Sequence, residues 1–374
     1  MAYQNIGTPR FFIDNYMYLR ALGLDPQEYI DQTSDINRYP DQYQVFKTPL
    51  DDENAFTLSP EIAKLFPRDS HTQRWFIPCG EMVRGMDFTG NMKWYGAILN
   101  HNFGDCNATI TRSLFAGAVH DENNTETHLD EDYNIILNLE SYSEQQNGSS
   151  IWSSDNVPTG ERFSGFTLVG TENDSDLSNL QIGAVSMGVM YTMPRNPDLK
   201  LNMEIEYDGY DEIKTLGGST LTNIRQTGTP LWVNEGKYSS PFSVGDFSDN
   251  SYLDGAKRNG RRSWNLKFSY ISDSDIFSSN YMNTMHMETT SDYDSSDKNT
   301  TGDAFEYNMF TDDSFIAQVW NKTLGGALPF IFQPDSNNDN PDQFCIAKFD
   351  MDSLKVSQVA FNTYNISLKI IEVW

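Results

Sequence analysis

Residues 263–270, SWNLKFSY, alternate strictly between apolar and polar side chains. Residues 364–373, YNISLKIIEV, repeat the pattern, and residues 200–207, KLNMEIEY, show it most cleanly. A period of two places alternate side chains on opposite faces of a strand. The inward positions expected in the first and last stretches are Trp264, Leu266, Phe268 and Tyr270, then Tyr364, Ile366, Leu368 and Ile370. In the middle stretch, Leu201, Met203, Ile205 and Tyr207 share one face. The sequence therefore predicts a mainly β fold.

Further short strands are expected where apolar runs are bounded by Gly, Asn and Asp. They cover residues 93–99, 108–111, 133–139, 163–169 and 180–192, of which the last has the character of a core strand with a bulge or bend. Short helices are expected at residues 12–22, ending at Gly23, at residues 59–66, and from 311 to a stop at 325–326. The fold class predicted is a β-sandwich or jelly-roll domain plus a second β-rich domain with a few short helices.

Four segments are expected along the chain. Residues 1–74 form an N-terminal extended or helical arm, and residues 75–207 a jelly-roll-like β-sandwich. Residues 208–262 are turn-rich and polar and form a long loop or arm, the kind of segment that often contacts a neighbour. Residues 263–374 form a C-terminal β-rich domain with one helix.

Composition and charge limit the classes of function that the chain is expected to have. The 374 residues carry a formal net charge of -27, with 13% aromatic residues. Such a charge repels nucleic acid and anionic lipid, and its simplest role is to keep the protein soluble until it assembles. The sequence contains no apolar stretch of membrane-spanning length. Three widely spaced cysteines fit a protein that folds in a reducing cytosol.

The motifs of nucleotide binding and acyl transfer are missing, so the chain is expected not to be an enzyme and to need no cofactor. Calcium is the leading candidate ion, with Asp335, Asn337 and Asp339 offering hard oxygen donors at alternate positions. The loop lacks the glycine and the final glutamate of an EF-hand, and the favoured interpretation is a solvated turn. The strand end at residues 100–102, NHN, could dock a sugar, although such side chains more often satisfy turn amides.

One basic cluster stands out in this acidic chain. It consists of Lys257, Arg258, Arg261 and Arg262. It is either a contact patch for an acidic neighbour, such as another copy of the same subunit, or a hairpin or linker that leads into the Trp264 strand. The sequence leaves both interpretations open.

The C-terminal part resembles structural proteins from the tails of tailed phages. The resemblance is carried by residues 262–270 (RSWNLKFSY) with 272–275 (SDSD), by residues 325–335 (GGALPFIFQPD) and by residues 364–372 (YNISLKIIE). Residues 97–102 (AILNHN) and 182–188 (IGAVSMG) resemble a jelly-roll, galactose-binding-like module found in the same proteins. The motifs are structural, and no catalytic residue is carried over.

The resemblance implies a virion structural subunit, assembled in the host cytoplasm, at the tail or baseplate. Its expected place is a symmetric ring that links the tail tube to distal host-recognition parts. The expected partners are further copies of itself and other tail proteins, with no specific nucleic acid and no membrane. The alternatives are a host-surface glycan-binding module of the tail and a capsid or neck component.

Overall fold

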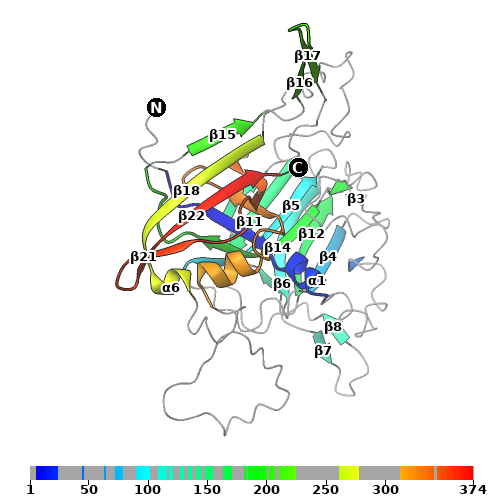
Figure 1. Cartoon of the computed structure of the whole chain (residues 1–374). Helices are drawn as coiled ribbons and strands as arrows, with labels where there is room; N and C mark the ends of the chain where they lie inside the picture. The colour runs from blue at the N-terminus through cyan, green and yellow to red at the C-terminus, as the bar shows by residue number, and fades with distance from the viewer. Residues whose placement is uncertain are drawn as a thin grey trace.

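The computed structural model describes the chain in several continuous stretches: residues 6–23, 90–101, 148–154, 184–199, 210–224, 261–277, 312–340 and 343–373. It also describes shorter strands at residues 44–45, 63–64, 72–78, 108–115, 118–120, 127–129, 134–136, 140–144, 163–170, 181–182 and 202–206. In these residues the fold is mainly β with a few short helices, which confirms the predicted mainly β class (Figure 1).

An 11-stranded sheet dominates the structure, and each of its paired strands runs antiparallel to its neighbour. Its path begins with β10 (Glu140–Glu144), β11 (Gly148–Ser154), β5 (Met92–His101), β14 (Ala184–Thr192) and β1 (Arg10–Asp14). It continues through β19 (Phe330–Gln333), β20 (Cys345–Phe349), β22 (Thr363–Glu372), β18 (Arg261–Ser272) and β15 (Asn202–Glu206). Strand β21 (Val356–Ala360) pairs with β22 off this path.

Smaller sheets and helices complete the described part. A five-stranded sheet contains β2 (Gln44–Val45), β4 (Thr72–Pro78), β12 (Phe163–Gly170), β6 (Ala108–Phe115) and β9 (Asn134–Ile136). Three strand pairs are β3 (Ala63–Lys64) with β13 (Gln181–Ile182), β7 (Ala118–His120) with β8 (Thr127–Leu129), and β16 (Tyr210–Lys214) with β17 (Thr220–Ile224). The helices are α1 (Asn15–Ala21), α6 (Asp273–Ile276) and η8 (Ile316–Asn321), a π-helix.

The large sheet crosses the predicted segment boundaries. Strand β1 belongs to the predicted N-terminal arm, yet it lies between β14 of the predicted sandwich and β19 of the predicted C-terminal domain. The segments therefore do not each build a separate sheet, and the N-terminal strand joins the central and C-terminal parts.

Both faces of this sheet are buried around β1. Phe11 and Ile13 belong to the larger apolar cluster, together with Trp94, Trp264 and Phe332. Phe12 points to the other face and packs in a second cluster, formed with Tyr95, Ala97, Leu99, Ile151, Ala184, Met190, Ile331 and Phe344. A strand buried on both faces needs apolar side chains at successive positions and shows no alternation.

The helix predicted at residues 12–22 is wrong in its first third. Phe12 and Ile13 lie in β1, and the helix begins only at Asn15. Asp14 is the N-cap, and its side chain accepts a hydrogen bond from Met17 N at 3.0 Å. Gly23 follows the helix with a φ of 78°, as its predicted role requires.

The alternation from residue 263 is confirmed up to Phe268 and fails at Tyr270. Trp264, Leu266 and Phe268 are buried, whereas Tyr270 is exposed. A bulge between Phe268 and Ile271 shifts the register, and Tyr270 adopts a φ of 61°. Ile271 is therefore buried where Tyr270 was expected, because a bulge inserts one residue and reverses the facing of those beyond it.

Of the segment expected as a long loop or arm, 208–262, the structure describes the β16–β17 hairpin and the first residues of β18. Of the helix predicted at 59–66 it describes only Ala63–Lys64, which form β3 and not a helix. The helix expected from residue 311 is present as η8 and ends before Gly325 and Gly326, both of which have positive φ. The alternation at 200–207 forms β15, but every residue of this strand is exposed.

Candidate functional site

The exposed strand β15 ends the large sheet. It pairs with β18, placing Met203 opposite Trp264 and Ile205 opposite Arg262. Met203 and Ile205 therefore lie on the face that carries the buried Trp264, yet 45% and 63% of their surfaces are exposed. The apolar face of the sheet thus extends one strand beyond its buried core.

The opposite face of β15 is acidic. It carries Glu204 and Glu206, and the pKa of Lys369 on β22 is raised first by its hydrogen bond and charge contact with Asp350 and, to a smaller extent, by these two glutamates. Lys369 Nζ lies 2.5 Å from Asp350 Oδ2, so this lysine is already paired. The edge therefore presents two apolar side chains on one face and two carboxylates on the other.

The β16–β17 hairpin stands away from the large sheet (Figure 1). Ile213 and Leu221 are directly opposite each other on one face, with 64% and 60% of their surfaces exposed. Leu216, in the turn, is fully exposed. The turn itself is ordered by hydrogen bonds between Thr215 and Ser219, because Thr215 N and Oγ1 both donate to Ser219 O, at 2.8 and 3.1 Å. A two-stranded hairpin is only marginally stable by itself in water, so packing of this apolar pair against another surface would stabilise it.

We call β15 together with the β16–β17 hairpin the apolar edge. Three residues, 207–209, connect the two parts. A second, smaller exposed patch lies at the turn between β21 and β22, where 88% of the Phe361 surface is exposed.

The predicted basic cluster is partly accounted for within the subunit. Lys257 and Arg258 lie outside the described residues, whereas Arg261 and Arg262 begin β18. Arg262 binds the buried Glu372 through Nε, Nη2 and its backbone N–H, each at 3.0 Å, and Nη2 also donates to Phe344 O at 3.0 Å. Its guanidinium also lies 5.4 Å from the centre of the Trp264 ring. Arg262 therefore joins β18 to β22, and its charge is paired with Glu372 within the same subunit.

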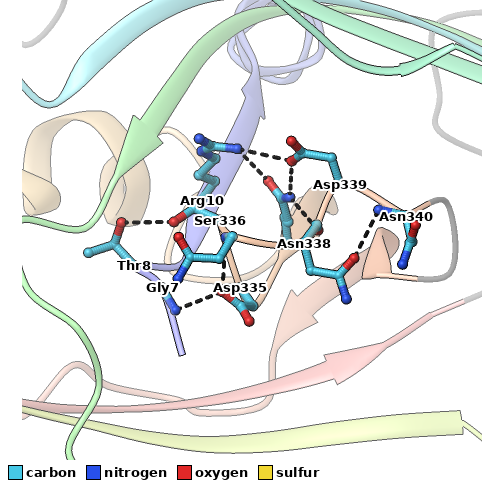
Figure 2. A network of polar contacts seen from close by, with 10 residues as sticks. Gly7, Thr8, Arg10, Asp335, Ser336, Asn338, Asp339 and Asn340 are labelled. Carbon is cyan, nitrogen blue, oxygen red and sulfur yellow. Dashed lines mark hydrogen bonds and ion pairs between the residues drawn. The ribbon is translucent and has the colours of Figure 1, made fainter. Parts of the chain in front are cut away.

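The candidate calcium loop is a network of turns that holds the N-terminal segment (Figure 2). Asp335 Oδ1 accepts hydrogen bonds from Gly7 N at 2.7 Å and Asn337 N at 2.9 Å. Asp339 Oδ1 accepts from Gln333 Nε2 at 2.8 Å and lies 3.4 Å from Arg10 Nη1. These oxygens meet N–H donors rather than converging on one point, and no cluster of three or more His, Cys, Asp or Glu side chains occurs in the described part of the chain. The loop has the contacts of the Asx turns that the sequence favoured.

The one side chain described at the candidate sugar-docking position, His101, makes a contact between two strands. His101 is buried at the end of β5, and its Nε2 lies 2.9 Å from Ser150 Oγ on β11. The side chains of the two neighbouring asparagines lie outside the described residues.

Asp14 and Lys322 are buried ionisable groups that were not expected from the sequence. Burial raises the pKa of Asp14 to about 7, although hydrogen bonds from Met17, Ser186 and Tyr16 lower it in part. Burial also lowers the pKa of Lys322 to about 7. Lys322 Nζ donates a hydrogen bond to Gln318 Oε1 at 2.5 Å, and Gln318 Nε2 in turn donates to Asp312 O. The cap position of Asp14 was the available signal for the first group, and nothing in the local sequence indicates the burial of the second.

The described helices include none with the length and apolar character needed to cross a membrane. Comparison with protein-family models, with curated proteins and with solved structures finds no match for this chain.

Proposed function

We propose that the chain is a structural subunit of a tailed-phage virion, a tail or baseplate component that forms a ring of identical copies. The observation that carries the proposal is the apolar edge. Met203 and Ile205 are large exposed apolar side chains on β15 of the large sheet, and Ile213 and Leu221 are such side chains on the separate β16–β17 hairpin. Exposed apolar surfaces of this kind mark contacts with other proteins.

The remaining features support the same role. Arg262, Asp335 and His101, each of which lies in a candidate site, are engaged in contacts that hold strands and loops together. The net charge of -27 suits a component that lines or surrounds a DNA conduit, because it repels the passing phosphates. The jelly-roll-like module and the place between tube and distal parts rest on the sequence resemblance and are part of the proposal.

The test is to locate the chain in particles. Purified virions should contain it in a fixed number of copies, as measured by quantitative mass spectrometry, and cryo-electron microscopy should place those copies in a symmetric ring at the tail. Absence from purified particles would refute the proposal. Release of reducing ends from host polysaccharide by the purified chain would indicate an enzyme instead, and saturable binding to host glycan without incorporation in a ring would indicate the glycan-binding alternative.

A further inference from the structure

Strand β15 and the β16–β17 hairpin each have an edge along which no described strand pairs. In the part of the chain that the structure describes, β15 pairs only with β18, and β16 and β17 pair only with each other. Edges that stay open expose backbone donors and acceptors, and these are templates for pairing with another strand.

Strand β17 matches the edge of β15 in its side-chain pattern. Its sequence, TLTNI, contains no charged residue. If it lies beside β15, Leu221 comes to the face of Met203 and Ile205, and Thr222 comes to the face of Glu204. Leu221 then continues the apolar pair of β15 on one face, next to the uncharged Asn223, and the other face receives Thr220, Thr222 and Ile224, none of which is charged.

Strand β16 lies behind β17. It adds Ile213, with Asp211 two residues earlier, to the face of Leu221, and it adds Lys214 with Glu212 to the face of the β15 glutamates. The hairpin therefore places one cation on the acidic face, which a second β15 does not. Two copies of β15 paired with each other would instead bring together Glu204 and Glu206 from both copies. Like charges on neighbouring strands are unfavourable, so charge favours the hairpin over a second β15.

We propose that the hairpin of one copy adds to the sheet of the next copy, with β17 pairing along the open edge of β15. A second copy is the chosen occupant because each copy carries both the edge and the matching hairpin, and the hairpin projects away from its own sheet (Figure 1). The contact joins two different surfaces, so it repeats from copy to copy and gives a closed ring or an open filament. This inference rests on the proposed function and names the surface that builds the ring.

Disulfide trapping tests the contact in the full chain. Glu204→Cys and Thr222→Cys in one chain should, after mild oxidation, give a ladder of dimers, trimers and larger species on a non-reducing gel. Each single variant should give at most a dimer, and the wild type controls for the native cysteines. An internal disulfide in a monomer would show that the hairpin folds onto its own β15, and no new disulfide at all would show that the two strands do not meet. Either result overturns the proposal.

Association measured by sedimentation gives an independent test. Leu221→Lys should weaken self-association at least about tenfold, because it places a charge in the apolar face of the contact. Phe361→Lys changes an apolar side chain that is even more exposed, on another hairpin, and it should leave self-association unchanged. Circular dichroism should show both variants folded.

Charge reversal adds the polar face to the test. Lys214→Glu should weaken association, and Glu204→Lys with Glu206→Lys in the same chain should restore it. A wild-type chain that stays monomeric, or a loss of association with Phe361→Lys alone, overturns the proposal. If the Leu221→Lys variant enters virions as efficiently as the wild type, this contact is refuted and the proposed function stands. If the chain is absent from virions, the proposed function itself is refuted.

Discussion

The buried ion pair between Arg262 and Glu372 gives the clearest stability prediction. Glu372→Ala removes a carboxylate that accepts three hydrogen bonds from Arg262, each 3.0 Å long. Removing one partner of a buried pair typically costs about 3–5 kcal/mol, because the other charge stays buried without compensation. The side chain of Arg262 is 18% exposed and keeps its hydrogen bond to Phe344 O, so we expect a loss near the lower end, about 3 kcal/mol.

Urea unfolding followed by tryptophan fluorescence measures this loss, and Trp264, next to the guanidinium, reports on the site directly. Asp352→Ala removes an exposed carboxylate from the same part of the chain and should change the free energy of unfolding by less than about 0.5 kcal/mol. The double variant Arg262→Met with Glu372→Leu should lose clearly less than the sum of Glu372→Ala and Arg262→Ala, because neither partner is then left as a buried lone charge. A loss below about 1 kcal/mol for Glu372→Ala, or full additivity, would refute the reasoning.

Three further predictions concern the core and the calcium loop. Gly188→Ala should destabilise the protein by about 3 kcal/mol or more in urea unfolding, because the new Cβ would lie 2.1 Å from a backbone carbonyl of β1; Gly217→Ala, with open space around it, is the control, and equal effects would contradict the argument. Because burial raises the pKa of Asp14 to about 7, the folded state holds a proton that the unfolded state releases near pH 4, so the stability contributed by this group is lost as pH rises from about 4 to about 7. The Asp14→Asn variant should therefore lose less stability over this pH range and should melt at a higher temperature than the wild type at pH 8. If the melting temperatures of the two proteins change equally with pH, the reasoning is wrong. Calcium at about 1 mM should leave the melting temperature unchanged, because Asp335 and Asp339 already accept hydrogen bonds. A rise in melting temperature that Asp335→Asn abolishes would show that this loop binds calcium.

The strands with one buried face were predictable from local pattern. Leu266 and Leu368 are paired in the structure and buried, as the alternation of their segments indicates. Alternation also predicted correctly that Met203 and Ile205 lie on one face of their strand. It could not predict that β15 is the last described strand of the sheet and that this face is therefore exposed. Period-two patterns identify which side chains share a face, whereas the burial of that face depends on what packs against it.

Strand β1 shows why the rest was not predictable. Its residues Phe11, Phe12 and Ile13 are apolar in succession because the sheet is covered on both faces there, and such a run cannot be distinguished from part of a helix by periodicity. Its partners, β14 and β19, are separated from it by more than 150 residues, so no local signal indicates them. The pairing of Arg262 with Glu372, 110 residues away, was hidden for the same reason.

The charge of the chain and its apolar edge have to be considered together. An open strand with Met203 and Ile205 exposed would normally be an aggregation hazard. A net charge of -27 makes every copy repel every other copy at long range, and Glu204 and Glu206 oppose most strands at short range. Strand β17 meets less of this local opposition than a second β15 would, because it is uncharged and the strand behind it carries Lys214 together with Asp211 and Glu212. Strong repulsion combined with one matching contact would therefore make self-association selective, and because screening relieves the repulsion, the proposed assembly should strengthen as salt is raised from about 50 to about 300 mM.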